Sequence, residues 1–561
     1  MISTLLLTLL CVPLHAQDVR ALMIGNSYTQ ANDLHLGFEA ALEAGVPPWD
    51  DALVKALTQG GATLADHAAQ ADGTQGDTAW RQELVTGEDA GTWAWVILQD
   101  QSQVPGFPQS QAEWQASRDG AVVLDGLIEA GGAETVFLLT WGRRDGDEAN
   151  PDRFPDFLTM QARLLEGYQA YADACAADGT RPWILPAGLA FQRVYQDLVA
   201  QGVTPEEEGN AFYQLYQADG SHPSAAGSYL TALTAVAALT GRDGASMSPP
   251  EGVDATLAAT LQAAARAITI DDPLGEIDFR WVFSWDDWNQ ARSPDISDEV
   301  LAPLVYLDHP VTGVQDLQVG VGDVGRLWLL DGAQLDIADQ LWIALGSRAE
   351  VRVSGGSLAV SSVEMDLYGG GDATLWVEGG TVTIGALSGE QGASVLLLGG
   401  TLQIGGGALP SPIQTGGTLV LGSGLRFTGD YALPPGASLT LSLTEDYAPW
   451  VSVDGDVTIE GDLTVQVEPS FDTCQGRFEL LDAGSIALDP SSVTLPDGAQ
   501  LVLLSRTGGQ TLFLEWNPSV DCLEGEPSPW ACACSGAGGA ASVALPLVAT
   551  ALAFLRRRRG R

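Results

Sequence analysis

The chain has 561 residues, which is more than a single compact core usually holds, so we expect two or three domains. Its 72 acidic and 25 basic side chains give a net charge of −47, which excludes the basic footprint that a nucleic-acid partner requires. The apolar share of 45% is that of a globular protein, and the surplus of acid predicts a solvated surface.

The amino-terminal segment, residues 1–16, is an uncharged and largely apolar run that ends in Leu14-His15-Ala16, before the first charged residues. Such a run is typical of a secretory signal peptide that is removed from the mature protein. We therefore expect the chain to be exported and its first domain to begin at residue 17.

Residues 17–243 alternate apolar strands with helical stretches, as an α/β protein does. Strands are predicted at 19–24, 95–98, 135–139 and 183–186, and helices at 157–177 and 225–239. Strands that alternate with helices form a parallel sheet, and functional residues gather at the carboxyl ends of its strands.

Residues 244–303 form a mixed segment. A helix is predicted at 255–268, and a tryptophan-rich stretch with Trp281, Trp285 and Trp288 follows it. The segment could cap the first domain or link it to the next one, and the pattern leaves both alternatives open.

From residue 304 to residue 518 the sequence changes to short β runs separated by glycine. Glycine pairs follow three of these runs, at 355–356, 379–380 and 399–400, so the spacing is 24 residues and then 20. Strands that repeat at this distance and cannot bury their faces alone stack on their neighbours. We expect an all-β, β-solenoid-like region.

The carboxyl-terminal end has three parts: a spacer at 519–534 that includes Cys532 and Cys534, an uncharged apolar run at 535–555, and an arginine-rich tail at 556–561. The apolar run is long enough to span a bilayer, and the positive-inside rule leaves the arginine tail in the cytoplasm. This order resembles the sorting signals described in myxobacteria and their relatives, which implies a sorting protease that acts near Cys532 or Cys534. A plain membrane anchor is the alternative. Cys474 and Cys522 could form a disulfide in an exported protein.

Ser27 stands directly after the first predicted strand, in Gly25-Asn26-Ser27. A serine at the open end of a parallel sheet meets the N-terminus of the next helix, which favours negative charge on a nucleophile. An ordinary turn serine would give the same short pattern, so Ser27 needs partners elsewhere before it indicates chemistry.

Those partners stand near the end of the same domain, at Asp219 and His222. An aspartate three residues before a histidine on one turn can hold the imidazole in the tautomer that accepts a serine proton. Pro223 then begins a helix, which would fix the loop geometry. The sequence predicts Ser27 as nucleophile, His222 as base and Asp219 as the group that orients the base.

These two blocks resemble those of the SGNH/GDSL hydrolase family over roughly residues 19–242. The resemblance implies a three-layer α/β/α fold with a parallel sheet, and ester hydrolysis through an acyl-serine intermediate, with no metal and no cofactor. It also implies an oxyanion hole built from the nucleophile's own N–H, a glycine N–H from a second block and an asparagine amide from a third.

The second and third blocks depart from the family pattern. The glycine could be Gly60 or Gly61, with Gly61 preferred, and no Gly-x-Asn-Asp block follows the second predicted strand. Residues 99–103 read Gln-Asp-Gln-Ser-Gln, which is similar to the Gln-Gly-Glu-Ser-Asn stretch of carbohydrate acetylesterase branches. That register puts Gln103 at the asparagine position, while Gln99 lies nearer the strand end. Either amide would offer N–H donors.

Three further residues are candidates for the substrate cleft. Trp141 and Arg143 follow the third predicted strand, where an aromatic ring and a cation would suit a sugar or a carboxylate. His67 could line the cleft or lie exposed on a helix.

The sequence therefore predicts an exported serine esterase of the carbohydrate O-acetylesterase kind, held at the cell surface and acting on an acylated carbohydrate or another small ester. A transferase, with a second hydroxyl in place of water, would use the same triad. The alternative from another class is a surface adhesin or glycan-binding protein whose hydrolase-like domain is vestigial and whose β repeats bind the partner.

Overall fold

The computed structural model describes residues 19–516, with gaps at 45–51, 179, 276, 292–294, 297–301, 322–323, 370, 391, 423, 444–450, 468–475 and 507. The predicted signal peptide, the apolar run at 535–555, the arginine tail and the cysteines at 474, 522, 532 and 534 lie outside the described residues. Within the part of the chain that is described, no helix is long and apolar enough to cross a membrane.

The first domain is built on a five-stranded parallel sheet with the strand order β2-β1-β3-β4-β5. Its strands are β1 (Arg20–Gly25), β2 (Leu53–Thr58), β3 (Trp95–Leu98), β4 (Glu134–Leu138) and β5 (Trp183–Leu185). The four predicted strands are confirmed to within one residue. All four residues of β3 are buried, as expected for a strand covered on both faces.

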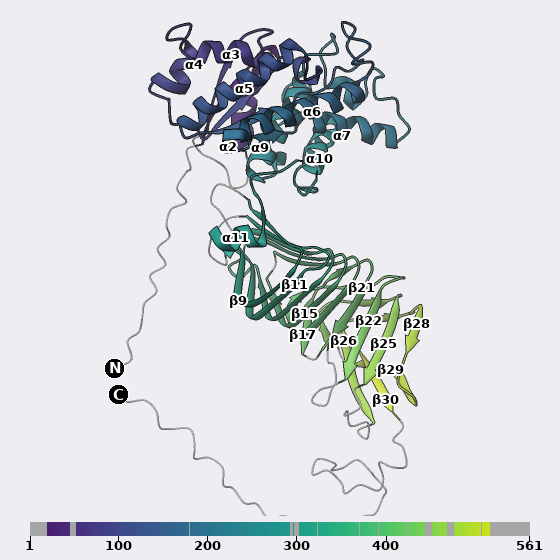
Figure 1. Cartoon of the computed structure of the whole chain (residues 1–561). Helices are drawn as coiled ribbons and strands as arrows, with labels where there is room; N and C mark the ends of the chain where they lie inside the picture. The colour runs from purple at the N-terminus through teal and green to yellow at the C-terminus, as the bar shows by residue number, and fades with distance from the viewer. Residues whose placement is uncertain are drawn as a thin grey trace, which may run out of the picture.

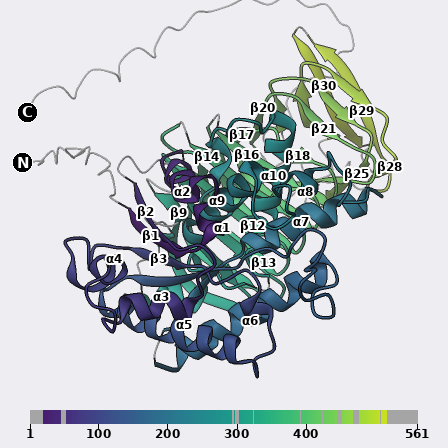
Figure 2. The ribbon, with the colours of Figure 1, turned by 90° about the horizontal axis from the view of Figure 1, so that it is seen from above.

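Helices cover both faces of this sheet and give a three-layer α/β/α arrangement (Figure 2). Four pack together on one face: α2 (Leu34–Glu43), α7 (Ala187–Ala200), α9 (Ala225–Thr240) and α10 (Ala255–Ala267). Three pack together on the other: α3 (Leu64–Ala71), α5 (Ala112–Ala130) and α6 (Phe157–Cys175). The chain leaves β1 through α2 and leaves β2 through α3, so it changes face at β1. The carboxyl end of β1 is therefore a topological switch point, where such sheets place their sites.

The segment at 244–303 belongs to both domains. Buried side chains from α10 through Trp281 join the first core, and Leu261 and Trp281 are both 0% exposed. Trp285 and Trp288, on the short helix α11 (Trp285–Ala291), join the second core instead. The first half of the segment thus caps the α/β domain and the second half begins the β region.

The β region is a solenoid whose first coils add parallel strands alternately to two long sheets (Figure 1). One sheet is made by β6 (Val282–Ser284), β8 (Leu304–Leu307), β10 (Gly325–Leu329), β12 (Arg348–Val353), β14 (Asp372–Val377), β16 (Ala393–Leu397) and β18 (Ile413–Gln414). The other begins with β7 (Asp295–Ile296), β9 (Pro310–Val321), β11 (Gln334–Leu345), β13 (Ser357–Met365), β15 (Thr381–Gly389) and β17 (Thr401–Pro410). A third, smaller sheet is made later in the chain by β21 (Tyr431–Leu433), β24 (Val457–Ile459) and β27 (Ile486–Leu488). Aliphatic side chains from the inner faces of these sheets form the second core.

The glycine pairs mark the same corner of successive coils. The second glycine of each pair has a positive φ, 64° at Gly356, 65° at Gly380 and 63° at Gly400, and Gly417 adds a fourth corner at 66°. A Cβ on Gly380 would lie 2.2 Å from the carbonyl oxygen of Gly356 in the coil before it. Glycine repeats here because the turn needs a left-handed residue and the next coil leaves no room for a side chain.

The far end of the solenoid is closed by an antiparallel hairpin. Strands β29 (Ala499–Arg506) and β30 (Gly509–Trp516) pair with each other, and β30 pairs with β26 (Arg477–Ala483). This pairing covers the edge of β26 that would otherwise continue the stack, which is a common way to block edge-to-edge association.

Candidate active site

Ser27 follows β1 and opens the short helix α1 (Ser27–Gln30), so it lies at the carboxyl edge of the sheet. Its N–H precedes the first intrahelical hydrogen bond and stays available to a ligand. Asn26 holds this turn, because its side chain accepts from the N–H of Tyr28 at 3.1 Å and donates to the carbonyls of Ala62 and Asp100 at 3.1 and 3.2 Å. The nucleophile turn is therefore tied to the two neighbouring loops that follow β2 and β3.

The fold brings the three predicted triad residues together. His222 Nε2 lies 2.9 Å from Ser27 Oγ, and His222 Nδ1 lies 2.6 Å from Asp219 Oδ2. Ser27 is half-buried, while the side chain of His222 is 35% exposed and that of Asp219 is 48% exposed. The arrangement is that of a nucleophile, a base and an orienting carboxylate on the solvent side of the sheet edge.

Asp219 is prepared for its role by its own turn. Its Oδ1 accepts hydrogen bonds from the backbone N–H groups of Ser221 at 2.9 Å and His222 at 3.0 Å. Partial burial acts to raise the pKa of Asp219, but the hydrogen bonds from the His222 ring and these two N–H groups outweigh it, so the pKa is lowered. Asp219 thus remains ionised under the conditions in which His222 must act as a base.

Trp141 lies behind the triad rather than in the cleft. It is 0% exposed, and its ring is stacked between those of Tyr28 at 5.1 Å and Phe191 at 4.4 Å. Its Nε1 donates to the carbonyl oxygen of Ser221 at 3.1 Å. A buried ring in this position supports the loop that carries His222. Because Trp141 is buried, it does not contact substrate, contrary to the expectation from the sequence.

Gln99 is committed to the nucleophile turn. Its Oε1 accepts from the backbone N–H of Asn26 and from Thr29 Oγ1, both at 2.9 Å, and its Nε2 donates to the carbonyl of Asp100. The side chain is 1% exposed. Gly25 makes this approach feasible, because a Cβ there would lie 2.6 Å from Gln99 Oε1. Gln99 therefore fixes the turn from below instead of facing a substrate oxygen.

Gln103 and Arg143 meet on a shared carboxylate, that of Asp147. Gln103 Nε2 donates to Asp147 Oδ2 at 2.5 Å, and Arg143 Nη1 pairs with Asp147 Oδ1 at 2.5 Å. The Asp147 side chain is fully buried, and burial is the largest influence on it; donors that include Asn150 and Gln103 nevertheless hold its pKa below the usual range. One of the two N–H groups of Gln103 is thereby occupied, which leaves the other for a ligand.

The predicted glycine donors sit on the turn after β2. Gly61 has a φ of +70°, and a Cβ added to either Gly60 or Gly61 would meet no atom within 4 Å, so the turn is open. The next residue, Ala62, accepts the side-chain hydrogen bond of Asn26, which places this turn beside Ser27. The turn that carries Gly61 is thus tied by a hydrogen bond to the residue before Ser27.

His67 is neither an exposed helix residue nor a cleft residue. It is 0% exposed on α3, and its Nδ1 accepts a hydrogen bond from Trp80 Nε1 at 3.1 Å. Burial lowers the pKa of His67 to about 4, so the ring is neutral at neutral pH. Its place is structural, in the layer beneath the loop that carries Gly61.

The sequence did not indicate the residues that hold the triad in place. Asn26, Tyr28 and Ser221 are recognisable only through their partners, since the Tyr28 hydroxyl lies 2.7 Å from Ser221 Oγ across 193 residues of chain. The one available signal was that Asn26 stands beside the nucleophile. Within the described residues, no group of three or more His, Cys, Asp or Glu side chains could hold a metal ion.

Comparison with known proteins gives matches among solved structures alone. No protein-family model matches the chain, and no curated protein matches it. A presumed SGNH hydrolase from Slackia heliotrinireducens is 26% identical over 39% of this chain and 97% of its own, with a TM-score of 0.28. A DUF4886 family protein from Bacteroides uniformis is 18% identical over 47% of this chain and 98% of its own, with a TM-score of 0.34.

A third structure, a catalytic mutant of an acetylxylan esterase from Geobacillus stearothermophilus, is 14% identical over 39% of this chain and 92% of its own, with a TM-score of 0.26. The solved structures that this chain is similar to thus include SGNH-type hydrolases and esterases. Each of these three likenesses covers less than half of the chain, so we base the chemistry on the geometry of the site itself.

Proposed function

We propose that this protein is a serine ester hydrolase that works through an acyl-serine intermediate. The observation that carries the proposal is the continuous chain of hydrogen bonds from Ser27 Oγ through His222 to Asp219, at 2.9 and 2.6 Å. A contact of this length lets the base take the serine proton as attack begins, and the carboxylate keeps the imidazole in the required tautomer.

The reaction follows from these positions. Ser27 Oγ attacks the ester carbonyl carbon while its proton passes to His222 Nε2. The resulting oxyanion is stabilised by the N–H groups of Ser27 and Gly61, with the remaining N–H of Gln103 as the amide donor. The intermediate collapses, and the leaving alkoxide takes the proton from His222. Water then attacks the acyl-serine, His222 accepts a water proton and returns it to Ser27 Oγ, and the carboxylic acid leaves.

Two features favour hydrolysis of an acyl group on a large alcohol. The triad side chains are partly exposed, so water reaches the acyl-serine and a polymeric alcohol is not excluded by size. The neighbouring loops carry Arg143 and Gln103, whose polar groups suit hydroxyl-rich partners. An acetylated carbohydrate is the substrate class that we propose.

We further propose that the enzyme acts outside the cytoplasm. The support is the apolar run at 1–16, the apolar run at 535–555 with the arginines that follow, and an acidic remainder with no basic footprint. Protease treatment of intact cells that make the full chain should remove the hydrolase domain, whereas protection of that domain would contradict export.

The test of the catalytic proposal is hydrolysis of an aryl acetate by the full-length chain and by Ser27→Ala, with and without a chelator. We expect Ser27→Ala to lose at least about 1,000-fold in kcat, because the nucleophile itself is removed. Ser110→Ala, an exposed serine of the same domain, is the matched control and should retain full activity.

Release of acetate from acetylated polysaccharides, compared with their deacetylated forms, then tests the substrate class. Equal rates for wild type and Ser27→Ala would overturn the serine mechanism. Absence of activity in both would favour the alternative function, a glycan-binding surface protein.

A further inference from the structure

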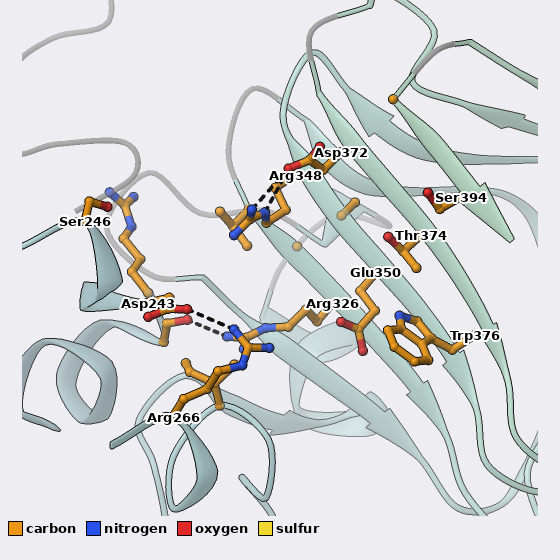
Figure 3. A pocket seen from close by; sticks show the side chains of 17 residues that line it. Asp243, Ser246, Arg266, Arg326, Arg348, Glu350, Asp372, Thr374, Trp376 and Ser394 are labelled. Atoms are coloured by element: carbon orange, nitrogen blue, oxygen red, sulfur yellow. Dashed lines mark hydrogen bonds and ion pairs between the residues drawn. The ribbon is translucent and has the colours of Figure 1, made fainter. Parts of the chain in front are cut away.

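A cavity of about 470 Å³ lies at the junction of the two domains, away from the triad (Figure 3). One wall comes from the end of α9 and from α10, and the other from the outer face of the solenoid strands β10, β12, β14 and β16. The volume falls within the range of about 300–1,000 Å³ that small-ligand sites occupy.

The cavity is separate from the hydrolase site. His222 stands just before α9, and Gly241, which lines the cavity, directly follows its last residue. A helix of 16 residues is about 24 Å long. A ligand of one or two sugar units in the cavity therefore cannot reach the nucleophile, and whatever binds there serves a purpose other than the ester chemistry.

The solenoid wall of the cavity is a row of polar side chains from successive coils. Arg326, Glu350, Thr374 and Ser394 are paired one after another in the parallel register. They face outward, because the residues next to them, such as Leu327, point into the core. Coils in such a stack are about 4.8 Å apart, so the row presents one polar side chain at each such step.

Arg326 is a buried cation without an ion-pair partner among the described residues. It is 6% exposed, its Nη2 donates to the carbonyls of Gly241 and Ala302 at 2.9 and 2.5 Å, and its Nε has no hydrogen-bond partner. Burial is the main reason that the pKa of Arg326 falls to about 10, so the group keeps its charge at neutral pH. The guanidinium also lies over the ring of Trp281, with its Cζ 4.4 Å from the ring centroid. Neither the ring nor the two carbonyls carries a negative charge, and buried charges are normally paired, so an anion in the cavity would complete this environment.

Two other arginines around the cavity are already neutralised. Arg266 pairs with Asp243 at 2.9 Å, and Arg348 pairs with Asp372 at 3.1 Å (Figure 3). The side chains of Arg266 and Arg326 approach each other from the two walls, and the charge of Arg266 further lowers the pKa of Arg326, although nearby carboxylates oppose this effect. An anion placed between the walls would relieve this repulsion and supply the missing partner.

Trp376 adds the feature that limits the class of anion. It lines the cavity, is half-buried, and lies beside Glu350 in the close view (Figure 3). The face of the Trp376 ring offers an apolar surface on which the C–H face of a sugar ring can stack. The carboxylate of Glu350 and the hydroxyls of Thr374 and Ser394 offer acceptors and donors for hydroxyl groups.

We propose that this cavity binds a saccharide unit that carries a carboxylate, with the carboxylate at Arg326 and the sugar ring over Trp376. This inference goes beyond the proposed esterase function and does not depend on it. A site of this kind would hold the protein on an acidic polysaccharide through the solenoid face, at a fixed distance from the catalytic domain.

The experiment measures binding to the full-length chain carrying Ser27→Ala, so that no ester chemistry intervenes. The probes are the methyl glycosides of glucuronate, galacturonate and mannuronate and of the three neutral sugars that carry CH2OH in place of the carboxylate. Calorimetry should show that at least one uronate binds at least ten-fold more tightly than its neutral counterpart. Added salt should weaken that binding.

Two variants locate the site. Trp376→Ala should weaken binding at least ten-fold, while Trp342→Ala should leave it unchanged, since Trp342 is half-buried like Trp376 but lies on the other sheet. Arg326→Gln, which removes the charge, should remove the preference for uronates. Far-UV circular dichroism and thermal unfolding of Trp376→Ala should match those of the parent chain, which shows that the solenoid remains folded.

Each of the other outcomes overturns the proposal. Equal binding of neutral and acidic sugars would remove the role of Arg326. Binding by no uronate, or binding that survives Trp376→Ala, would remove the site. Loss of esterase activity in Ser27→Ala has no bearing on these results, so the two proposals fail separately.

Discussion

Beneath the nucleophile turn lies Asp100, a carboxyl group that is 0% exposed. Its Oδ1 accepts from the N–H of Leu64 and Ser117 Oγ, both at 2.9 Å, and its Oδ2 accepts from the Tyr171 hydroxyl at 3.1 Å. Burial is the dominant influence and, although these donors oppose it, raises the pKa of Asp100 from 3.8 to about 6. The folded protein therefore binds more protons here than the unfolded chain does between pH 4 and 6.

This pKa shift predicts how stability depends on pH. Because the folded-state pKa is the higher one, the contribution of Asp100 to the free energy of unfolding falls as the pH rises from about 4 to 6, by about 3 kcal/mol. Asp100→Asn keeps the shape and removes the titration, so its stability relative to wild type should increase by about that amount between pH 4 and pH 7.

Urea unfolding at both pH values measures the difference. Asp152→Asn, which changes an exposed carboxylate, is the control and should track wild type. If the difference in the free energy of unfolding between wild type and Asp100→Asn does not change with pH, the raised pKa of Asp100 is contradicted.

Residue by residue, the sequence predicted the groups whose geometry is local. Asp219 and His222 share one turn, and Ser27 follows a strand that is readily recognised, so their proximity followed from the topology of a parallel sheet. The roles of Gln99 and Gln103 could not be derived in the same way. Asp147 folds back onto Gln103 from a distant loop, and the partner of a buried amide is decided by such tertiary contacts.

At the scale of elements, the strands that were predicted are those that are buried on both faces. Strand β2 was missed because it is an edge strand that is largely half-buried and carries Lys55, which pairs with Glu83 at 3.1 Å. An edge strand with a charged residue lacks the continuous apolar run that marks a central strand. The solenoid was recognisable because its corners impose glycine, which leaves a periodic signal in the sequence.

The same corners predict a sharp response to a single methyl group. Gly380→Ala adds a Cβ 2.2 Å from a carbonyl of the preceding coil, at a φ of +65°. Gly346→Ala is the matched control, since Gly346 has a φ of +74° and open space around it. We expect the control to lose about 1–2 kcal/mol from the backbone conformation, and Gly380→Ala to lose about 1–3 kcal/mol more from the clash.

Calorimetry of the full-length chain compares the two variants. Equal losses for Gly380→Ala and Gly346→Ala would mean that the coils can move apart at the corner and that the stacking is looser than the structure indicates.

For the whole molecule, the first domain extends beyond residue 243, where the predicted alternation of strands and helices ends. Leu261 of α10 is 0% exposed and Leu257 is 7% exposed, both in the core of the hydrolase domain. Burying one such side chain contributes roughly 1.5–3 kcal/mol, against a typical domain stability of about 5–15 kcal/mol.

A hydrolase domain truncated after residue 245 should therefore unfold at a lower temperature than one truncated after residue 281. Circular dichroism of the two truncated chains, 17–245 and 17–281, checks this expectation. Identical melting temperatures would show that α10 packs on the domain without stabilising it.

The number of coils in the solenoid sets the distance between its two ends. Each of the regular coils adds one strand to each of the two long sheets and advances the chain by about 4.8 Å along the stack. These coils therefore lengthen the distance from the first domain to the terminal hairpin in equal steps. Since neighbouring coils repeat the same register, duplication or deletion of one coil of 20 to 24 residues would change that distance by one step and leave the remaining pairs as they are. Insertion or deletion of whole coils can therefore adjust the distance between the first domain and the terminal hairpin without any change to either of them.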